Sequence, residues 1–244
     1  LIATAKQITE KPSRREMDML LATGEQVSVS LMAITMIQMG VSAVSLNAWQ
    51  VPMHTTSDYQ NARFKRIDTE RIRKELDDNK IVIVTGFQGI NKYDDITTLG
   101  RGGSDTTAVA LAAELHADVC EIYTDVDGVY TADPRIVPNA RKMEEVTYDE
   151  MLEMASLGAK VLHSRCVEIA KKYGVELLVC SSLNRNSGTM VREKTKMEKM
   201  LISGVAADKN VAKIRVAGLG NDPESTFRLL NLLDRNNLNI DVMI

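Results

Sequence analysis

The sequence predicts an α/β fold in which helices cover both faces of a mainly parallel sheet. Two observations carry this prediction. Helical and extended patterns alternate as far as residue 192, and the extended segments are short apolar runs such as Ile81–Val84. Strands that are apolar throughout are buried on both faces, as in parallel sheets. Ligands of such sheets bind at the carboxyl ends of the strands, so we expect a functional site there.

The expected elements follow in order from the first residues, which have the pattern of a helix interior. Past Gly24, apolar residues recur at helical spacing, and Gly40 is typical of a helix end. The other expected helices are a charged one capped by Asp68 and ending at Leu76, and an alanine-rich one that begins at Asp105 or Thr106 and ends at His116. The expected strands are 43–46, 81–84, 119–123 and 177–179.

Composition and charge argue against several classes of protein. The chain has 244 residues, 44% of them hydrophobic, which suffices for a sizeable core. A net charge of -3 offers no basic surface for nucleic acid or an anionic membrane. No apolar run approaches the roughly 20 residues of a membrane span, and the start has no signal-peptide pattern. Cys120, Cys166 and Cys180 lack metal-ligand spacing, so we expect free thiols in a cytoplasmic protein, with no metal site built from them.

The segment Gly100–Asp105 (G-R-G-G-S-D) is the most informative part of the sequence. Glycines let a backbone approach an anion closely, and the free N–H groups at the start of the following helix favour negative charge. Arg101 is suited to grip a carboxylate through two hydrogen bonds. Asp105 adds an acid to a site suited to anions, which favours binding of a metal or an ammonium, or orientation of the reacting groups. The alternative is a structural turn in which Asp105 only caps the helix.

The segment Tyr123–Arg135 (Y-T-D-V-D-G-V-Y-T-A-D-P-R) follows a predicted strand and favours a nucleotide-binding loop. Tyr130 is suited to flank a base, Thr124 and Asp125 to hydrogen-bond the base or its sugar, and Arg135 to meet a phosphate. The alternative is an Asp-rich solvated loop with an Asp-Gly turn. The spacing of the aspartates resembles the start of an EF-hand, but no glutamate stands at the closing position, which argues against calcium.

Further positions have both a structural and a functional interpretation. Glu25 is expected at a helix start, where it caps the helix or receives a ligand ammonium. Gly86–Gly89 (G-F-Q-G) is either a simple turn or a loop that lines the substrate. Lys160 is either a surface lysine or a partner for phosphates. His163, on an apolar stretch, is expected to be a packed histidine rather than a catalyst.

The pattern changes after residue 192. A charged link leads to an expected strand at 213–219, a helix at 223–235 and a strand at 238–244. A βαβ unit of this size cannot bury a core alone, so we interpret it as the first half of a small regulatory domain. The sequence therefore predicts a catalytic domain over 1–192 and a linker with half a regulatory domain over 193–244. We expect the chain to be a portion of a longer protein.

Taken together, these motifs resemble those of aspartate kinases, in particular bacterial ones controlled by lysine and threonine. The matching segments have that family's order and spacing and extend over essentially the whole chain: L-x-T-G-E-Q from Leu21, G-F-Q-G at 86–89, T-T-L-G-R-G-G-S-D-T-T at 97–107, the segment 123–135, and G-A-K-V-L-H at 158–163. I-S-G-V-A-A-D-K-N at 202–210 is similar to the entry of the family's ACT regulatory region. The resemblance implies an amino-acid-kinase fold, an αβα sandwich, followed by a partial ACT domain.

The resemblance also implies ligands and site residues. L-aspartate is the implied substrate, and ATP and Mg²⁺ are the implied cofactors. Carried over by position, the substrate site comprises Glu25, Phe87, Arg101, Gly102, Gly103 and Ser104, with Asp105 and Arg101 as the catalytic residues. The ATP site comprises Tyr123, Thr124, Asp125, Tyr130, Asp133, Arg135 and Lys160.

The implied reaction transfers the γ-phosphate of ATP to the β-carboxylate of L-aspartate and gives 4-phospho-L-aspartate. It is the first step of lysine, threonine and methionine biosynthesis and is feedback regulated. Lysine, threonine or both are the expected effectors, bound where ACT units meet in a homo-oligomer or with an ACT-containing partner chain. The expected effector-binding residues are Asn221, Asp222, Asn239, Ile240 and Asp241.

The chain departs from the family pattern in several places. It lacks the N-terminal Lys-Phe-Gly-Gly motif and the Ser/Thr segment after it, and it has Ser164 where many relatives have proline. It also has Asp222-Pro-Glu224 where Lys-Pro-Gly is common. Two alternatives stay open: a kinase of the same fold that acts on glutamate or uridylate, and a non-catalytic amino-acid-sensing subunit. The L-x-T-G-E-Q segment and the ACT half argue against the first, and a titration with ATP tests the second.

Overall fold

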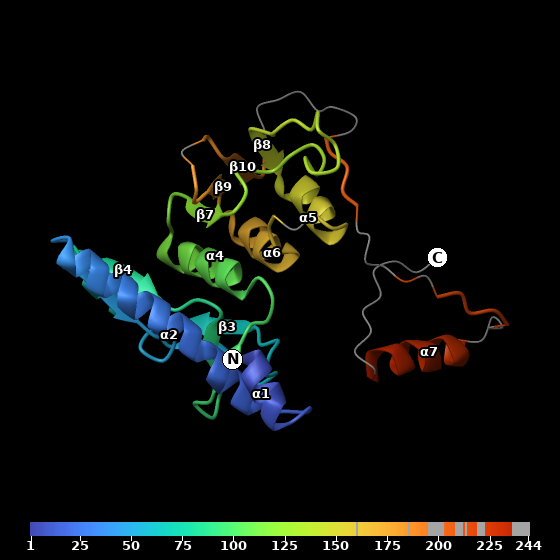
Figure 1. Ribbon diagram of the computed structural model, residues 1–244, viewed down its shortest axis with the longest axis horizontal. Helices are drawn as coiled ribbons and strands as arrows, with labels where there is room; N and C mark the ends of the chain where they lie inside the picture. Colours follow the sequence, from blue (N-terminus) through green and yellow to red (C-terminus); the bar gives the residue numbers. More distant parts are fainter. Residues whose placement is uncertain are drawn as a thin grey trace.

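A computed structural model describes residues 1–159, 161–184, 186–194, 203–207, 212, 214–218 and 223–235. Figure 1 shows a layered α/β arrangement in which helices pack against short strands. The elements, in chain order, are α1 (Ile2–Ile8), α2 (Arg14–Gln38), β1 (Ala43–Leu46), β2 (Met53–Thr55), β3 (Phe64–Ile67), α3 (Glu70–Asp77), β4 (Ile81–Val84), β5 (Gln88–Ile90), β6 (Ile96–Thr98), α4 (Gly103–Leu115), β7 (Cys120–Thr124), β8 (Glu145–Thr147), α5 (Tyr148–Ser156), α6 (Ser164–Tyr173), β9 (Leu177–Ser181), β10 (Thr189–Arg192) and α7 (Pro223–Arg235).

The strands form three hydrogen-bonded groups. β1 pairs with β4 in parallel, β3-β2-β5-β6 form a second group, and β7-β9-β10-β8 form a third. The pairs β1–β4, β2–β5, β7–β9 and β8–β10 are parallel, whereas β2–β3, β5–β6 and β9–β10 are antiparallel. The mainly parallel α/β class predicted from the sequence is therefore confirmed. The antiparallel strands were not predicted, because three-residue strands such as β5 and β6 are too short to show a pattern.

The four predicted strands are present as β1, β4, β7 and β9, and the predicted helices as α2, α3 and α4. The start predicted for α4, at Asp105 or Thr106, is wrong, because the helix begins at Gly103. Gly102 is its N-cap in the left-handed conformation (φ 65°), so the turn into the helix is complete two residues before Asp105. Asp68 accepts a hydrogen bond from the Glu70 N–H at 3.0 Å, in keeping with its expected place at the start of α3.

Helix α4 lies between two hydrophobic clusters. Val109 belongs to the larger one, formed by α4, α5, α6 and the β7-β9-β10-β8 strands, and Ala110 belongs to the smaller one around Leu46 and Met53. A helix that is apolar on opposite sides is buried, and its alanines let neighbouring elements approach closely. Figure 1 shows α4 between α2 and α6. Because α4 is held from both sides, its N-terminus is a fixed point in the molecule.

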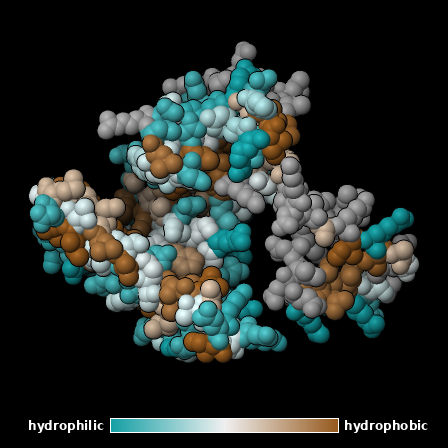
Figure 2. All heavy atoms as spheres, in the orientation of Figure 1, coloured by the Kyte–Doolittle hydropathy of each residue, from teal (hydrophilic) through white to brown (hydrophobic). Residues whose placement is uncertain are grey.

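Helix α2 is continuous through Gly24 and is the longest helix of the described chain. Val27, Leu31 and Ile34 are 59–63% exposed, and Figure 2 shows apolar atoms along this helix. An 18-residue window of α2 has a mean hydropathy of 1.4, with 17% of it buried, so by length and composition the helix could cross a membrane. The expectation that no segment is long enough is therefore wrong for this helix. One such helix is weak evidence for a membrane location, because core helices of soluble proteins pass the same test.

The end of the chain is only partly described. The helix predicted at 223–235 is present as α7. The strand predicted at 213–219 is not found, because the described residues 214–218 form no strand. The predicted strand 238–244 lies outside the described residues. The division into domains at residue 192 stays a prediction.

Candidate functional site

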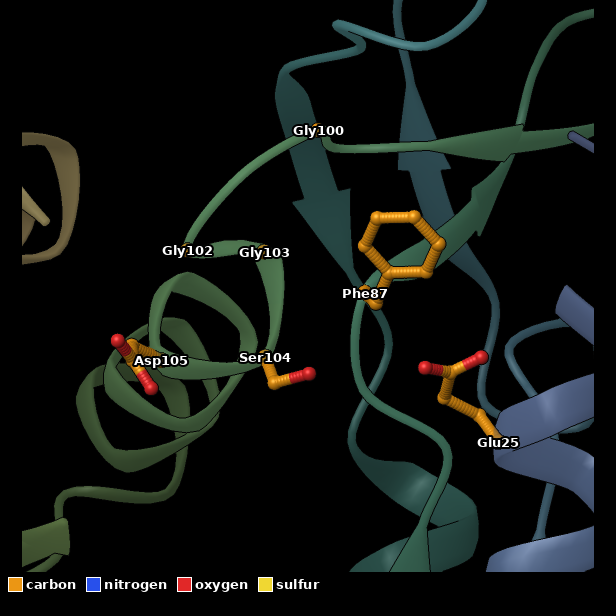
Figure 3. Close-up of a pocket in the computed structure, with 7 residues that line it drawn as sticks. All are labelled: Glu25, Phe87, Gly100, Gly102, Gly103, Ser104 and Asp105. Carbon is orange, nitrogen blue, oxygen red and sulfur yellow. The ribbon is translucent and has the colours of Figure 1, made fainter. Parts of the chain in front are cut away.

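A pocket of about 390 Å³ lies where α2, the β4–β5 connection and the start of α4 meet. Its lining residues are Glu25, Phe87, Gly100, Gly102, Gly103, Ser104 and Asp105. Figure 3 shows Glu25 on one side of the pocket and the loop before α4 on the other, with Phe87 between them. The structure thus brings together three segments that are far apart in the sequence.

Glu25 reaches the pocket from the middle of α2, not from a helix start. The helix begins at Arg14 and continues past Gly24, so the prediction that Glu25 lies at a helix start is wrong. A glycine within a helix lowers its stability but does not end it when packing holds the flanking turns. The Oε2 atom of Glu25 is buried and has no hydrogen-bond partner in the described part of the chain. A buried carboxylate oxygen without a donor is costly, which favours an external cationic or N–H ligand.

Phe87 lines the pocket from a strained connection between β4 and β5. Its φ of 68° lies in the left-handed region, which is unusual for an aromatic residue. Two neighbours hold this conformation: the Phe87 N–H donates to Thr107 Oγ1 at 3.0 Å, and the Leu99 N–H donates to the Phe87 carbonyl at 2.9 Å. Strain that surrounding bonds maintain is a common property of binding sites.

The loop before α4 presents backbone N–H groups to the pocket. Gly100 and Gly102 have φ values of 79° and 65°, and the Gly103 N–H turns back to the Gly100 carbonyl at 3.1 Å. A Cβ atom on Gly103 would lie 2.8 Å from the Phe87 ring, so only glycine fits there. The first N–H groups of α4 lack helical acceptors and carry partial positive charge. This side of the pocket is therefore suited to an anion.

Asp105 and Ser104 leave the first turn of α4 on opposite sides. Ser104 points toward Glu25 and Phe87, and Asp105 points away from them (Figure 3). Burial raises the pKa of the Asp105 carboxyl, whereas the charge of His163 lowers it. The Asp105 charge in turn helps to raise the pKa values of Cys120 on β7 and Cys166 on α6, beyond the effect of their own burial. The Asp105 charge is thus within electrostatic reach of β7, the strand from which the predicted nucleotide loop leaves.

Arg101 is exposed and is not among the residues that line the pocket. It lies in the middle of the glycine-rich loop, between two residues that do line it. The substrate contact predicted for Arg101 therefore stays a prediction that requires its side chain to turn inward.

The predicted nucleotide loop contains side chains that bind one another. The Tyr123 hydroxyl donates to Glu121 at 2.9 Å, Thr124 donates to Asp125 at 3.1 Å, and Tyr130 donates to Asp127 at 2.9 Å. The Arg135 guanidinium forms two hydrogen bonds with Asp133, at 3.0 and 2.9 Å, while its side chain is 85% exposed. None of these residues lines the pocket around Glu25.

Other predicted site residues lie elsewhere. Lys160 and all five predicted effector-binding residues are outside the described residues. His163 is not a packed histidine, and this expectation is wrong: its side chain is exposed and caps α6 by accepting the Arg165 N–H at 3.3 Å. An apolar neighbourhood in the sequence did not indicate burial here, because the helix begins at the next residue. The three cysteines are buried free thiols.

Two residues that support the pocket were not predicted. Asp18 is fully buried on α2 and accepts hydrogen bonds from the Gln60 and Thr98 N–H groups, at 3.0 and 2.8 Å, and from the Thr98 hydroxyl at 2.8 Å. Arg165 donates to the carbonyls of Leu99 and Ala62, each at 2.9 Å. No local pattern marks either residue, because their partners lie at least 42 positions away in the sequence.

Comparisons with known proteins show the family of the chain. The amino acid kinase family model matches residues 2–181. An aspartokinase of Geobacillus stearothermophilus is 52% identical over 245 residues, which cover 100% of this chain and 60% of that protein. The chain thus spans about three fifths of the length of that relative.

Solved structures of Escherichia coli aspartokinase III are similar in fold. The one in complex with aspartate and ADP has a TM-score of 0.79 at 29% identity and covers 95% of this chain and 53% of that one. The one in complex with lysine and aspartate has a TM-score of 0.74 at 28% identity and the same coverage. These comparisons confirm the resemblance and the fold expected from the sequence. The chain belongs to the amino acid kinase family, in which aspartokinases match it along its whole length.

Proposed function

We propose that the protein containing this chain is an aspartate kinase that transfers the γ-phosphate of ATP to the β-carboxylate of L-aspartate, giving 4-phospho-L-aspartate. The observation that carries the proposal is the pairing of opposite charges across one small pocket. Glu25 contributes an unpaired buried carboxylate oxygen, and the start of α4 contributes free N–H groups. An amino acid carries an ammonium and a carboxylate on one carbon, which is the complement of this arrangement.

In this proposal, Glu25 receives the substrate ammonium, and Gly102 and Ser104 hold a carboxylate through their N–H groups, while Gly103 lines the pocket beside Phe87. Arg101 turns inward on binding and forms two hydrogen bonds with the α-carboxylate. Phe87 fills the space between the two charged walls. The β-carboxylate is then left free to face the γ-phosphate.

The chemistry needs positioning and charge neutralisation more than a base. A carboxylate is already ionised and nucleophilic at neutral pH, so its oxygen attacks the γ-phosphorus as the bond to the β-phosphate oxygen breaks. Asp105 lies on the other side of the α4 start from Ser104. Its carboxylate has no hydrogen-bond donor in the described part of the chain, although burial opposes its charge. Such a group is suited to a cation.

Asp105 is therefore the residue that would hold Mg²⁺. Among the described residues no group of three or more His, Cys, Asp or Glu side chains gathers around one point. This agrees with Mg²⁺, which proteins hold through one or two carboxylates together with substrate phosphates. When bound, the ion would neutralise charge on the phosphates that face the substrate.

The loop 123–135 is the proposed nucleotide side, with Tyr123, Thr124, Asp125, Tyr130, Asp133 and Arg135, joined by Lys160. It leaves the carboxyl end of β7, where ligands of parallel strands bind. The Arg135–Asp133 and Tyr130–Asp127 pairs are exposed or half-buried, so they can exchange partners for phosphate and base at little cost.

Regulation is also part of the proposal. Lysine, threonine or both act as feedback effectors at Asn221, Asp222, Asn239, Ile240 and Asp241, where ACT units pair in a homo-oligomer or with an ACT-containing chain. One of the similar E. coli structures holds lysine, which supports this class of effector. We place the protein in the cytoplasm, at the first step of lysine, threonine and methionine biosynthesis, without a nucleic-acid or membrane partner.

The decisive experiment is a turnover assay on the intact protein with ATP, Mg²⁺ and a panel of acceptors: L-aspartate, L-glutamate and uridylate. Hydroxylamine traps an acyl phosphate formed from aspartate or glutamate as a hydroxamate that is measured directly, and uridylate is scored by the formation of its diphosphate. We expect product with aspartate alone. Product with glutamate or uridylate would assign another kinase activity. Calorimetric binding of lysine or threonine without binding of ATP would instead identify a sensing subunit.

A further inference from the structure

Arg165 bridges two segments that flank the pocket. It lies in the first turn of α6, and its Nη1 and Nη2 atoms donate to the carbonyls of Leu99 and Ala62, 66 and 103 positions earlier in the chain. Both distances are 2.9 Å. The two branches of one planar guanidinium thus fix the spacing of two backbones, which a lysine, with one point of charge, cannot do.

The carbonyls that Arg165 holds belong to the support of the glycine-rich loop. Leu99 is buried, and its N–H donates to the Phe87 carbonyl at 2.9 Å. Ala62 is also buried, and its N–H donates to the Thr98 carbonyl at 2.9 Å. Arg165 therefore completes the hydrogen bonding of the Leu99 peptide group immediately before Gly100 and of Ala62, whose N–H is bonded to Thr98.

The start of α6 touches the same loop at a second point. A Cβ atom on Gly102 would lie 2.3 Å from the Cβ of His163, so the His163 side chain lies directly against Gly102. Gly102 is the N-cap of α4. The loop that presents the N–H groups is thus enclosed between α6 on one side and Phe87 on the other, and it cannot shift without displacing Arg165.

Arg165 is partly withdrawn from solvent and has charges of both signs near it. Burial and the neighbouring charge of Arg63 lower the pKa of its guanidinium, and the charge of Glu168 opposes them. Both hydrogen-bond partners given above are neutral carbonyls. A half-buried cation held by carbonyls contributes little to stability, since its desolvation offsets much of the hydrogen-bond energy. The presence of Arg165 next to an anion-binding loop is better explained by the spacing of the two backbone segments that it holds.

We propose that Arg165 is a positioning residue for the acceptor substrate: through the Leu99 and Ala62 carbonyls it holds the 99–103 backbone in the conformation that aims the α4 N–H groups at the substrate carboxylate. The inference rests on the proposed function. It assigns a role to the start of α6, which lies outside the pocket lining.

The test compares Arg165→Lys, which keeps the charge, with Arg165→Gln, which removes it, in the intact protein. Arg73→Lys is the matched control, because Arg73 also donates to a backbone carbonyl, that of Glu114 at 2.8 Å, but at the opposite end of α4. The first measurement is amide hydrogen exchange, which needs no substrate. The Leu99 and Gly103 amides should exchange at least about tenfold faster in both Arg165 variants than in the wild type. Their exchange should be unchanged in the control. The amides of β7 and β9 should exchange at the wild-type rate in all variants.

The second measurement is steady-state kinetics. The KM for aspartate should rise about tenfold in both Arg165 variants, while the KM for ATP and kcat stay within about twofold of the wild type. A merely structural role would change all three together. Wild-type values in Arg165→Lys would overturn the inference, since charge alone would then suffice. If the wild type does not phosphorylate aspartate, the proposed function fails, and amide exchange at Leu99 and Gly103 still decides whether Arg165 holds the loop.

Discussion

The two loops of the proposed site are held in different ways. The residues next to the acceptor loop Gly100–Ser104 are held by side chains of other elements: the buried Asp18 of α2 and Thr107 of α4, and the half-buried Arg165 of α6. The nucleotide loop, 123–135, combines exposed pairs within itself, such as Arg135 with Asp133, with bonds to neighbouring segments. Among the latter, Thr189 accepts the Val129 N–H at 2.8 Å and donates to the Met143 carbonyl at 2.6 Å.

This difference indicates which loop must be ordered before its ligand binds. A small acceptor is positioned by a few hydrogen bonds, and a displacement of about 1 Å lowers the rate steeply, so its loop has to be rigid before binding. A nucleotide offers a large surface, and its loop can exchange internal pairs for ligand contacts. Substitutions that disturb the acceptor loop should therefore lower activity and stability more than substitutions that disturb the nucleotide loop.

The largest effect is expected for Asp105→Asn, which keeps the shape of the side chain and removes its charge. We expect kcat to fall about 10²–10³-fold, with both KM values changed far less, because the charge acts on the reacting groups rather than on binding. Glu114→Gln, exposed on the same helix, is the control and should behave as the wild type. A near-normal kcat would show that Asp105 is a residue of the first turn of α4 and has no catalytic role.

Asp18→Ala tests the scaffold of the acceptor loop. Its removal leaves the Gln60 and Thr98 N–H groups without their acceptor, and we expect the free energy of unfolding to fall by about 3 kcal/mol. Urea titration measures this change. If the loss is below about 1 kcal/mol, the loop has other sufficient supports and the contrast between the two loops weakens.

We also expect Asp18 to make the stability of the protein depend on pH. Burial raises the pKa of the folded carboxyl above its ordinary 3.8, although its hydrogen bonds with Thr98 and Gln60 oppose this. The folded state then holds a proton more tightly than the unfolded state. The contribution of Asp18 to stability should therefore decrease as the pH rises from 3.8 through the raised pKa. Asp18→Asn keeps an acceptor in place and should lack this decrease; an identical pH profile in both proteins would contradict the assignment.

Glu25→Gln tests the acceptor pocket directly. The loss of charge opposite the substrate ammonium should raise the KM for aspartate about 30- to 100-fold and leave the KM for ATP unchanged. Glu16→Gln, exposed on the same helix, is the matched control. An equal rise in both KM values would show that the substitution disturbs α2 rather than one binding contact.

The smallest effect is expected for Thr189→Val on the nucleotide side. The substitution keeps the shape and removes one side-chain anchor of the loop, so the free energy of unfolding should fall by about 1–2 kcal/mol. The KM for ATP should rise only a few-fold, because the loop adapts to its ligand. A loss as large as that of Asp18→Ala would show that both loops are equally preorganised. Thermal and urea unfolding, with ATP kinetics, distinguish these outcomes.

The sequence by itself determined the class of fold and the residues that meet at the pocket. Short apolar runs predicted β1, β4, β7 and β9, because a buried strand must be apolar wherever it lies. Glycines at 100, 102 and 103 predicted a tight approach of the backbone, and the structure shows a left-handed φ at Gly100 and Gly102. Such features depend on the residue and its immediate neighbours.

The tertiary structure alone decided which side chains face one another. Glu25 was expected at a helix start, but packing along α2 keeps the helix intact and aims the carboxylate into the pocket from its middle. Ser104 and Asp105 are neighbours in the sequence and point to opposite sides of α4 (Figure 3). Asp18 and Arg165 act on partners up to 80 and 103 positions away. The physical reason is that a local pattern sets backbone conformation, whereas the partner of a buried charge is set by where the packed elements bring the chain together.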